Sequence, residues 1–296
     1  MTVTRHCRGS RDRRPTAFPP LDRRAVLALF GLLGLSVTGA SVPVPPPGAD
    51  VADEEITSSV ILPAPGVTEI IPAPPNPVRA GEYLKFSVNW GIINGGNAWL
   101  EVPEVKEVDG QQAFHLVARA ESNGFISRFY KVRNRIESWW DRAGRHSLRY
   151  SENRREGKHR TETDIVFDHD RRVARYKDGE TFPIPPDVQD ALSSFYYTRY
   201  QALPVGGSIV FDYHASKKNK PLEVKVIGRE RVKVPAGEFD CVVVEPVLRA
   251  GGIFRNEGRL VIWLTDDERR IPVLMRSKVT IGSVSVMLEE YRTSNG

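Results

Sequence analysis

Hydrophobic and polar residues alternate in short runs along most of the chain between Arg79 and Thr293. In EYLKFSVNW (82–90), every second residue from Leu84 to Trp90 is apolar, which is the pattern of a β-strand with one buried face. INGGN (93–97) follows and is typical of a hairpin turn, and AWLEVPEV (98–105) then resumes the alternation. This region predicts two antiparallel strands joined by a tight turn.

The same alternation recurs about every ten to fifteen residues downstream, with turn residues between the runs. It predicts further strands at 112–121, 130–140, 147–152, 161–167, 173–179, 208–214, 222–234, 238–246, 259–264, 272–281 and 283–291. Strands at this spacing are typical of a single antiparallel sheet, and so many strands in one sheet predict strong curvature.

One segment has a helical period instead. PPDVQDALSSFYYTRYQAL places two prolines before a run whose apolar residues recur at three and four positions. Asp187 and Asp190 in the first turns suit the positive end of the helix dipole, so we expect a helix near 187–202. An apolar sheet face needs a cover. The predicted fold is therefore mainly β (α+β), a strongly curved antiparallel sheet or half-open barrel wrapped around one helix.

The N-terminal residues divide into two further parts. Residues 1–40 carry seven arginines and then the apolar run Ala25–Ala40, which predicts an export signal with small residues near its end for cleavage. Sixteen helical residues span only about 24 Å, which favours a cleaved signal over a permanent anchor. The signal is of the Sec type, with the twin-arginine route as the alternative because Arg23 and Arg24 precede the apolar run.

Residues 41–78 contain ten of the 22 prolines of the chain and predict a disordered, proline-rich tether. The expected organisation is a signal at 1–40, the tether at 41–78 and a single β-rich domain at 79–296.

The net charge belongs to the signal rather than to the domain. The chain has 42 basic and 37 acidic residues, and residues 1–40 contain seven arginines and two aspartates. The remainder therefore has 35 residues of each sign. A formal charge of zero gives no support for a nucleic-acid partner.

Several stretches resemble a family of exported bacterial proteins of unknown function. They are GEYLKFSVNWGIINGGNAWLEV, YKVRNRIESWWD, DALSSFYYTR, VPAGEFDCVVVEP and LVIWLTDDERRIPVLMRSKVTIGSVSVMLEEY. They cover residues 80–292 in order. The layout is also similar to that of the half-barrel lipoprotein carriers of the periplasm. The family resemblance implies export and supplies no catalytic residues.

Motifs of enzyme chemistry are missing from the sequence. There is no G-x-S-x-G elbow and no phosphate-binding glycine loop, and no two histidines stand at the spacing of a metal site. The aspartates and histidine of FDHD (167–170) are explained by a hairpin turn. We therefore expect no catalytic residues, no metal and no cofactor, although carboxylates distant in sequence could still meet in a glycan hydrolase.

Aromatic residues are the first candidates for binding. The proposed groove between helix and sheet contains Trp90, Trp99, Trp139, Phe195 and Tyr196. Adjacent tryptophans on a strand face opposite sides, so only one of Trp139 and Trp140 can enter the core. The alternative is that these aromatic residues simply fill a curved sheet.

A basic cluster between residues 128 and 160 is the second candidate. A contact with anionic lipid or glycan is expected at Arg149, Arg154, Arg155, Lys158 and Arg160. The alternative is a solvated hairpin face.

The thiol of Cys241 is the remaining candidate for chemistry. It follows a Pro-Ala-Gly turn and shares a strand face with Phe239 and Val243, so we expect a buried, unreactive cysteine.

The leading functional hypothesis is a non-catalytic envelope protein that binds an apolar or amphipathic ligand (a lipid, lipoprotein or glycan) in a concave sheet, with peripheral membrane contact. The alternatives are a protein-interaction module without a pocket and, third, an envelope glycan hydrolase.

Overall fold

The computed structural model describes residues 60–62, 66–248, 259–278 and 283–293. The predicted export signal (1–40) and the tether residues 41–59 lie outside the described residues, and so do residues 63–65.

Most of the described chain forms one antiparallel sheet. Its strands are β1 (Val60–Leu62), β3 (Glu82–Trp90), β4 (Ile93–Val108), β5 (Gln111–Ser122), β6 (Val132–Asp141), β7 (Ser147–Glu156), β8 (His159–Asp168), β9 (Val173–Tyr176), β10 (Thr181–Pro183), β12 (Ser208–Ala215), β13 (Lys218–Val234), β14 (Gly237–Leu248), β15 (Leu260–Thr265), β16 (Pro272–Lys278) and β17 (Ser283–Arg292). The order in this 15-stranded sheet is β1-β12-β13-β14-β15-β16-β17-β3-β4-β5-β6-β7-β8-β9-β10. A second, 2-stranded sheet pairs β2 (Glu69–Ile71) with β11 (Leu203–Val205).

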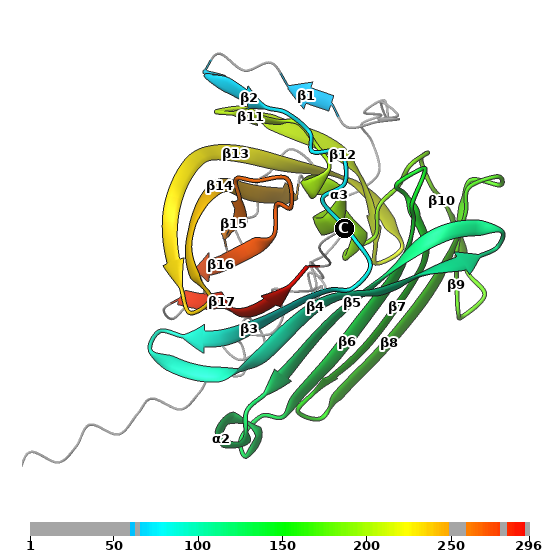
Figure 1. Ribbon diagram of the computed structural model, residues 1–296. Coiled ribbons are helices and arrows are strands. Elements are labelled where there is room, and N and C mark those ends of the chain that lie inside the picture. Colours follow the sequence, from blue (N-terminus) through cyan, green and yellow to red (C-terminus); the bar gives the residue numbers. More distant parts are fainter. Residues whose placement is uncertain (1–59, 63–65, 249–258, 279–282, 294–296) are drawn as a thin grey trace, which may run out of the picture.

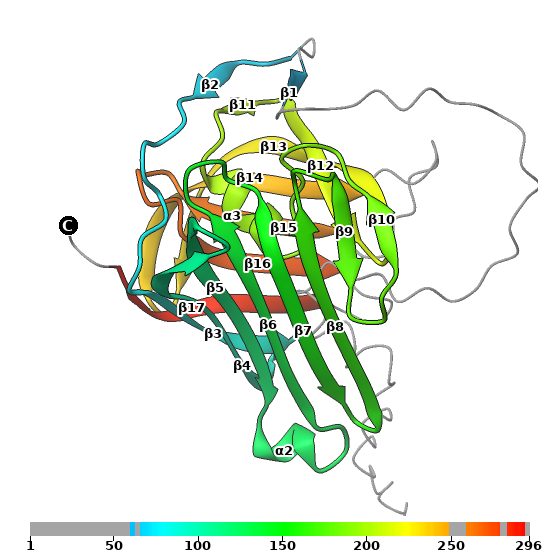
Figure 2. The ribbon, with the colours of Figure 1, turned by 90° about the vertical axis from the view of Figure 1, so that its right-hand side faces the viewer.

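The large sheet curves around one short helix. In Figure 1, β13 to β17 form a tight curve on one side, β4 to β8 form a long arm on the other, and α3 (Ser193–Arg199) lies between them. Figure 2 shows the same enclosure from the side. The sheet ends at β1 and β10 without joining them. The predicted fold, a curved antiparallel sheet around one helix, is confirmed.

Irregular pairing helps the long strands to bend. The register shifts between Val88 and Asn89 in the pair of β3 with β4, and again in five other strand pairs. A shift of this kind adds local twist and re-aims the strand. Gly96 lies at the first of these shifts, where a Cβ atom would stand 2.0 Å from the carbonyl oxygen of Glu121. The hairpin turn itself is Gly91 and Ile92, so INGGN begins β4 rather than forming the predicted turn.

The helix is shorter than predicted. The sequence indicated 187–202, whereas α3 begins at Ser193 and ends at Arg199. Asp187 has a left-handed backbone (φ 55°), and the backbone of Gln189 bonds to Asp212 and His214 of the sheet. Asp190 then accepts hydrogen bonds from the amides of Leu192 and Ser193. These residues fix the entry of the helix, and their sheet contacts replace the first predicted turns.

The end of the predicted tether is packed rather than disordered. β2 pairs with β11, and Ile71 and Val78 are buried. The prolines prevent long strands but leave their carbonyl groups free to accept hydrogen bonds. Pro72 and Pro77 accept them from Arg270 and Arg199. The folded region therefore begins before residue 79.

A buried ion pair joins this segment, the helix and the sheet. Arg199 at the end of α3 is 0% exposed, and its Nη1 and Nη2 atoms donate to the Glu82 carboxylate over 2.8 and 2.7 Å. Its Nη2 also donates to the carbonyl oxygens of Pro77 (2.7 Å) and Arg269 (2.8 Å). One guanidinium therefore connects three regions that are distant in the sequence: residues 77–82, the end of α3 and the turn at Arg269.

We predict that Glu82→Gln lowers the free energy of unfolding by about 3 kcal/mol, because it leaves the buried Arg199 without its counter-charge. Urea unfolding followed by circular dichroism measures the change. Lys85→Met is the control. Lys85 lies on the same strand as Glu82 and forms a partly exposed ion pair with Glu289, so its loss should lower the free energy of unfolding by less than about 1 kcal/mol. Equal losses in the two variants would contradict this account.

Cys241 is buried as expected. Its side chain is 1% exposed, its Sγ lies 3.6 Å from the carbonyl oxygen of Phe239, and burial raises the pKa of its thiol to about 12. Val234 and Gly237 pair across the predicted turn.

We predict that iodoacetamide leaves Cys241 unmodified in the native Cys7→Ser variant and alkylates it completely in denaturant, because only the thiolate reacts. Intact-mass spectrometry counts the adducts. Rapid native alkylation would show that the strand opens.

Candidate functional site

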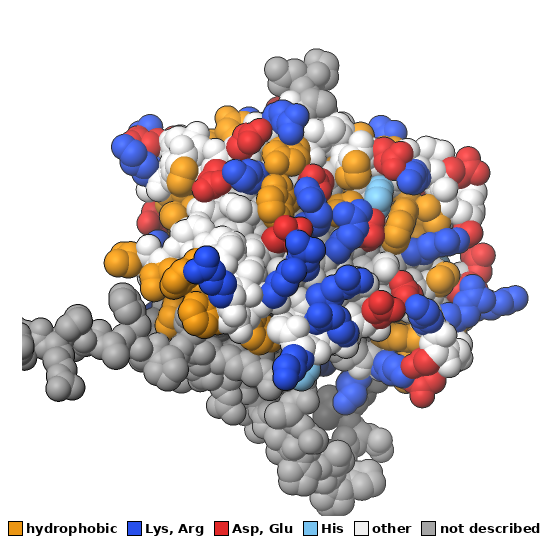
Figure 3. All heavy atoms as spheres, turned by 90° about the horizontal axis from the view of Figure 1, so that it is seen from below, with side chains coloured by type: hydrophobic (Ala, Val, Ile, Leu, Met, Phe, Trp, Pro, Cys, Tyr) orange, Lys and Arg blue, Asp and Glu red, His pale blue; other side chains and the backbone are white. Residues whose placement is uncertain are grey.

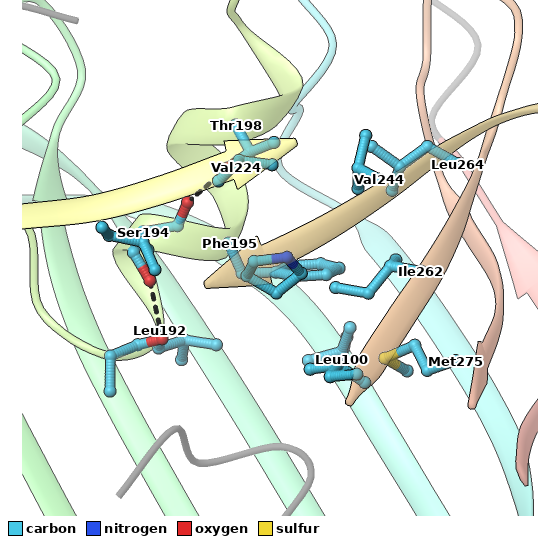
Figure 4. A pocket seen from close by; sticks show the side chains of 14 residues that line it. Leu100, Leu192, Ser194, Phe195, Thr198, Val224, Val244, Ile262, Leu264 and Met275 are labelled. Atoms are coloured by element: carbon cyan, nitrogen blue, oxygen red, sulfur yellow. Dashed lines mark hydrogen bonds between the residues drawn. The ribbon is translucent and has the colours of Figure 1, made fainter. Parts of the chain in front are cut away.

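Two hollow regions among the described residues share one lining residue, Ala191. The first is an apolar cavity of about 40 Å³ between α3 and the tightly curved part of the sheet. Its lining consists of Leu100, Ala191, Leu192, Ser194, Phe195, Thr198, Leu222, Val224, Val244, Pro246, Leu260, Ile262, Leu264 and Met275. Figure 4 shows the Phe195 ring projecting from the helix between Leu192 and Ile262. The hydroxyl of Ser194 donates to the carbonyl oxygen of Ala191 just before the helix, and that of Thr198 donates to the carbonyl oxygen of Ser194, so they offer a ligand little.

The apolar cavity is too small for a long acyl chain. Apolar cavities of roughly 150 Å³ accept a ligand as small as benzene. A space of about 40 Å³ is well below that size. In this conformation it can take a small apolar group and no more.

The second hollow is a polar cleft of about 480 Å³, which falls in the usual range of ligand pockets. We call it the seam cleft. It is lined by Tyr150, Glu152, Glu162, Thr163, Asp164, Ile165, Tyr176, Lys177, Asp178, Ala191, His214, Ala215, Ser216 and Lys217. These residues come from β7, β8 and β9 on one side, from the β12–β13 hairpin on another, and from the turn before α3. The cleft therefore combines two tyrosine rings with four carboxylates.

The seam cleft lies where the two ends of the sheet approach each other. Side chains, not a strand ladder, connect these ends. The Tyr176 hydroxyl lies 2.9 Å from His214 Nε2 and accepts a hydrogen bond from the Lys217 amide over 2.9 Å. Lys217 Nζ contacts Asp178 at 2.7 Å and also Glu180, and Asn219 donates to the carbonyl oxygen of Pro183. We call this set of contacts the seam latch.

The hydrogen bonds of His214 fix its tautomer. Its Nδ1 lies 2.6 Å from Asn219 Oδ1, an oxygen that can only accept. Nδ1 therefore carries the proton, and Nε2 accepts from the Tyr176 hydroxyl. Burial lowers the pKa of His214, so the ring stays neutral near pH 7. Both ring nitrogens are occupied, which leaves this histidine without a free position for acid–base work.

Most charges around the cleft are paired. Glu152 forms an ion pair with Arg154 and accepts a hydrogen bond from the Tyr150 hydroxyl over 3.0 Å. Lys177 lies 3.7 Å from both Glu162 and Asp164. Burial raises the pKa of Tyr150, so this phenol remains protonated. Four carboxylates against two lysines leave the lining acidic, which favours ligands that carry hydrogen-bond donors or positive charge.

A separate polar cluster anchors the start of the helix. The Asp190 carboxylate is buried and accepts a hydrogen bond from Ser138 Oγ at 2.6 Å, and Ser147 and Ser193 are 2.7 Å apart beside it. Burial raises the pKa of Asp190, while these donors oppose that shift. All these side chains are at most 1% exposed. The cluster therefore serves the fold, because a substrate has no access to it.

The structure separates the predicted aromatic site. Of the five residues proposed for the groove, only Phe195 lines the apolar cavity; Tyr196 is buried beside it, and Trp90 is half-buried at the end of β3. Trp99 and Trp139 lie on the convex face, where Arg119 covers Trp99 at 4.8 Å and His115 stacks on Trp139 at 4.9 Å. The placement of these two tryptophans in the groove is therefore corrected.

Trp140 takes the inward position instead. It is 0% exposed, and its Nε1 donates to Gln189. Trp140 is in phase with the inward residues Val132 and Ile136 of β6, whereas Trp139 is not, so the alternation of this strand decides which of the two tryptophans turns inward.

The five basic residues predicted to contact an anionic surface do not form one exposed group. Arg154 turns inward to Glu152, and Arg149 pairs with Asp109 at 2.9 Å. Arg155, Lys158 and Arg160 are exposed around the β7–β8 turn. Only these three stay available for an anionic surface.

Sequence reasoning missed the seam cleft. Tyr176, His214 and Lys217 come from strands about forty residues apart, and each looks ordinary in its own segment. Their meeting depends on how far the sheet curves, which residue periodicity does not encode.

Within the described residues, no group of three or more His, Cys, Asp or Glu side chains is arranged to hold a metal ion. Neither α2 (Gly124–Ser127) nor α3 has the length and hydrophobicity needed to cross a membrane.

Comparison with known proteins identifies a family and a fold. The family model described as protein of unknown function (DUF3108) matches residues 85–289. A β-barrel-like protein of the domain of unknown function DUF1849 from Brucella abortus has a similar structure, with a TM-score of 0.50 at 9% identity, over 77% of this chain and 100% of that one. None of the curated protein sequences compared with the chain matches it.

Two further structures align with TM-scores of 0.28 and 0.29. The first is a protein from Bacteroides fragilis described as exported and YmcC-like in fold (14% identity, 75% of this chain and 100% of that one). The second is described as a lipoprotein from Parabacteroides distasonis (11% identity, 75% and 99%).

We predict that the free energy of unfolding decreases as the pH falls through the range between the ordinary histidine pKa, about 6.5, and the lower pKa values of the folded chain. Burial lowers the pKa of His214 and of His146 below 6.5 in the folded chain, so the unfolded chain takes up the protons first. The stabilisation is complete above this range and is lost below it. Urea unfolding at several pH values measures the slope.

His214→Gln should flatten this slope, whereas His159→Gln, at an exposed position, should leave it unchanged. An unaltered slope in His214→Gln would refute the assignment.

Proposed function

Because this chain belongs to the DUF3108 family, whose description names no activity, we propose a function from the cavities that the chain itself contains. The protein is a non-catalytic, exported envelope protein that binds an amphipathic ligand. The ligand's polar part occupies the seam cleft, and a short apolar part points past Ala191 toward Phe195. The observation that carries this proposal is that a ligand-sized polar cleft and an apolar cavity share the lining residue Ala191.

The sizes of the two spaces favour this arrangement over a carrier of long acyl chains. The larger space, of about 480 Å³, is the polar one. The apolar space is about twelve times smaller, so it supports recognition of a small hydrophobic substituent rather than storage of a lipid tail.

The chemistry of the lining narrows the ligand class. Carboxylates such as Asp164 and Asp178 accept hydrogen bonds from hydroxyl or amine groups, and the half-buried ring of Tyr176 offers an apolar face. A hydroxyl- or amine-bearing compound with a short apolar group matches this lining. A glycan fragment or a short peptide of the envelope has that chemistry.

Binding without catalysis is supported by the state of the titratable groups. His214 has both nitrogens engaged, Glu152 is paired with Arg154, and Asp190 is enclosed. Export is supported by the signal pattern of residues 1–40 and by a lone thiol buried in the core, where it is protected in an oxidising compartment.

The test is native purification followed by denaturing extraction and mass spectrometry of what the protein carries. We predict a small amphipathic compound in the wild-type protein and its loss in Thr163→Trp, because the larger side chain fills the cleft. Thr161→Trp is the matched control, since Thr161 is exposed on the same strand and does not line the cleft.

Retention of the compound by Thr163→Trp, or an empty wild-type cleft under native conditions, would argue for an interaction module instead. Conversion of the extracted compound by the purified protein would argue for a hydrolase.

A further inference from the structure

Three loops meet at one end of the long strands and form a surface that the ligand site does not use. They are the β3–β4 turn, the loop that contains α2, and the β7–β8 turn; we call them together the tip. Asn123 Nδ2 donates to the Asn94 carbonyl oxygen over 2.7 Å, and the Gly157 amide donates to the Lys131 carbonyl oxygen over 2.8 Å. These bonds hold the three loops side by side. In Figure 2, α2 and the ends of β6 to β8 mark the tip at the lower end of the sheet.

Large apolar side chains project from the tip. Ile92 is 102% exposed, Phe125 58% and Phe129 69%. The two phenylalanine rings contact each other edge to face, with centroids 5.7 Å apart. The other exposed large hydrophobic side chains among the described residues are Ile70 (54%) and Ile227 (45%), and they lie away from the tip. Such a concentration at one place indicates a binding surface rather than chance exposure.

The backbone beneath these side chains is held firmly. The Asn123 side chain accepts the Ile126 amide over 2.9 Å and so caps α2, and Ile126 itself is buried. Ser122 and Ser127 are linked through their hydroxyl groups over 2.7 Å, and Ser122 Oγ also accepts the Val132 amide. These hydrogen bonds therefore fix the backbone in the conformation that holds the two phenylalanine rings exposed.

Basic side chains surround the apolar ones. The exposed cations at the tip and on the adjoining strand ends are Arg128, Lys131, Arg133, Arg155, Lys158 and Arg160. None of the six forms an ion pair with another described residue, although most other lysines and arginines on the long strands do. Figure 3 shows many Lys and Arg side chains on the lower face of the molecule, with hydrophobic ones at its margin. Glu156, the nearest carboxylate in the β7–β8 turn, points inward and accepts a hydrogen bond from Asn134.

An anionic bilayer surface fits this combination better than a protein groove does. Exposed Phe and Ile side chains insert at the boundary between headgroups and acyl chains, while Lys and Arg remain at the level of the phosphates. The exposed apolar residues of the tip lie in turns and beside a four-residue helix, and neither of the two hollows described above is lined by a residue of the tip. We propose that the tip docks the protein onto a membrane surface containing anionic lipids.

This docking would place the seam cleft close to the bilayer. β8 begins in the tip at His159, and its residues Glu162–Ile165 line the cleft. Three to six residues of strand cover about 10 to 20 Å. The proposal about the tip stands without the ligand, because it rests on a different set of residues.

Vesicle sedimentation of the full chain tests the docking. We expect binding to vesicles of phosphatidylglycerol and phosphatidylethanolamine, weaker binding to phosphatidylcholine, and a decrease as salt is raised. The triple variant Ile92→Ser, Phe125→Ser, Phe129→Ser should lose about tenfold in affinity for anionic vesicles, and so should Arg133→Glu with Lys158→Glu. The matched controls are Ile227→Ser and Lys233→Glu, which remove an exposed isoleucine and an exposed lysine of β13.

A probe at the tip distinguishes vesicle binding by the tip from vesicle binding by the apolar run of residues 25–40, which all these variants contain. An environment-sensitive dye on Phe125→Cys, in a Cys7→Ser background, should shift to the blue more strongly with anionic vesicles than with phosphatidylcholine vesicles, and the same dye on Ile227→Cys should not shift. An unshifted dye at position 125, or equal binding by the wild type and both tip variants, would overturn the proposal.

Discussion

The buried pair of Arg199 and Glu82 is the interaction on which the arrangement of this molecule depends. A charged guanidinium at 0% exposure is tolerated only because the carboxylate and two backbone carbonyls surround it. These partners belong to the first long strand, the segment before it and the turn after β15, so they can be satisfied only in one relative position. Arg270 repeats this arrangement with the carbonyl oxygens of Pro72 and Gln201. The helix is thereby fixed against the tightly curved part of the sheet.

The helix packs against the tightly curved part of the sheet, so the larger hollow of the concave face, the seam cleft, lies on the other side. The tightly curved part packs against Phe195 and leaves an apolar space of about 40 Å³, whereas the two ends of the sheet are linked by the side-chain contacts of the seam latch. Side-chain contacts of partly exposed groups are weaker than a strand ladder. The polar cleft therefore lies where the structure can open at least cost, and where its lining carries the most chemistry.

Strand positions could be predicted from the sequence because alternation reports which face of a strand is buried, as in β3, β6 and β17. The helix limits could not, because Gln189 and Asp190 exchange helical bonds for bonds to the sheet and to Ser138. The inward position of Trp140 follows the alternation of β6 from Val132 and Ile136, whereas the docking of Pro72 and Pro77 depends on distant arginines. The seam cleft was missed for the same reason: its residues become neighbours only through the curvature of the whole sheet.

The most direct test of the central claim, that the seam cleft is the ligand site, is photo-crosslinking in cells. A benzoylphenylalanine at Ala215, which lines the cleft, would capture whatever occupies it, and intact-mass spectrometry would weigh the adduct. The account predicts an added mass of one small molecule, on the order of hundreds of daltons, as expected for an occupant of a pocket of this size. An unmodified protein, or an adduct with a whole second protein, would contradict it.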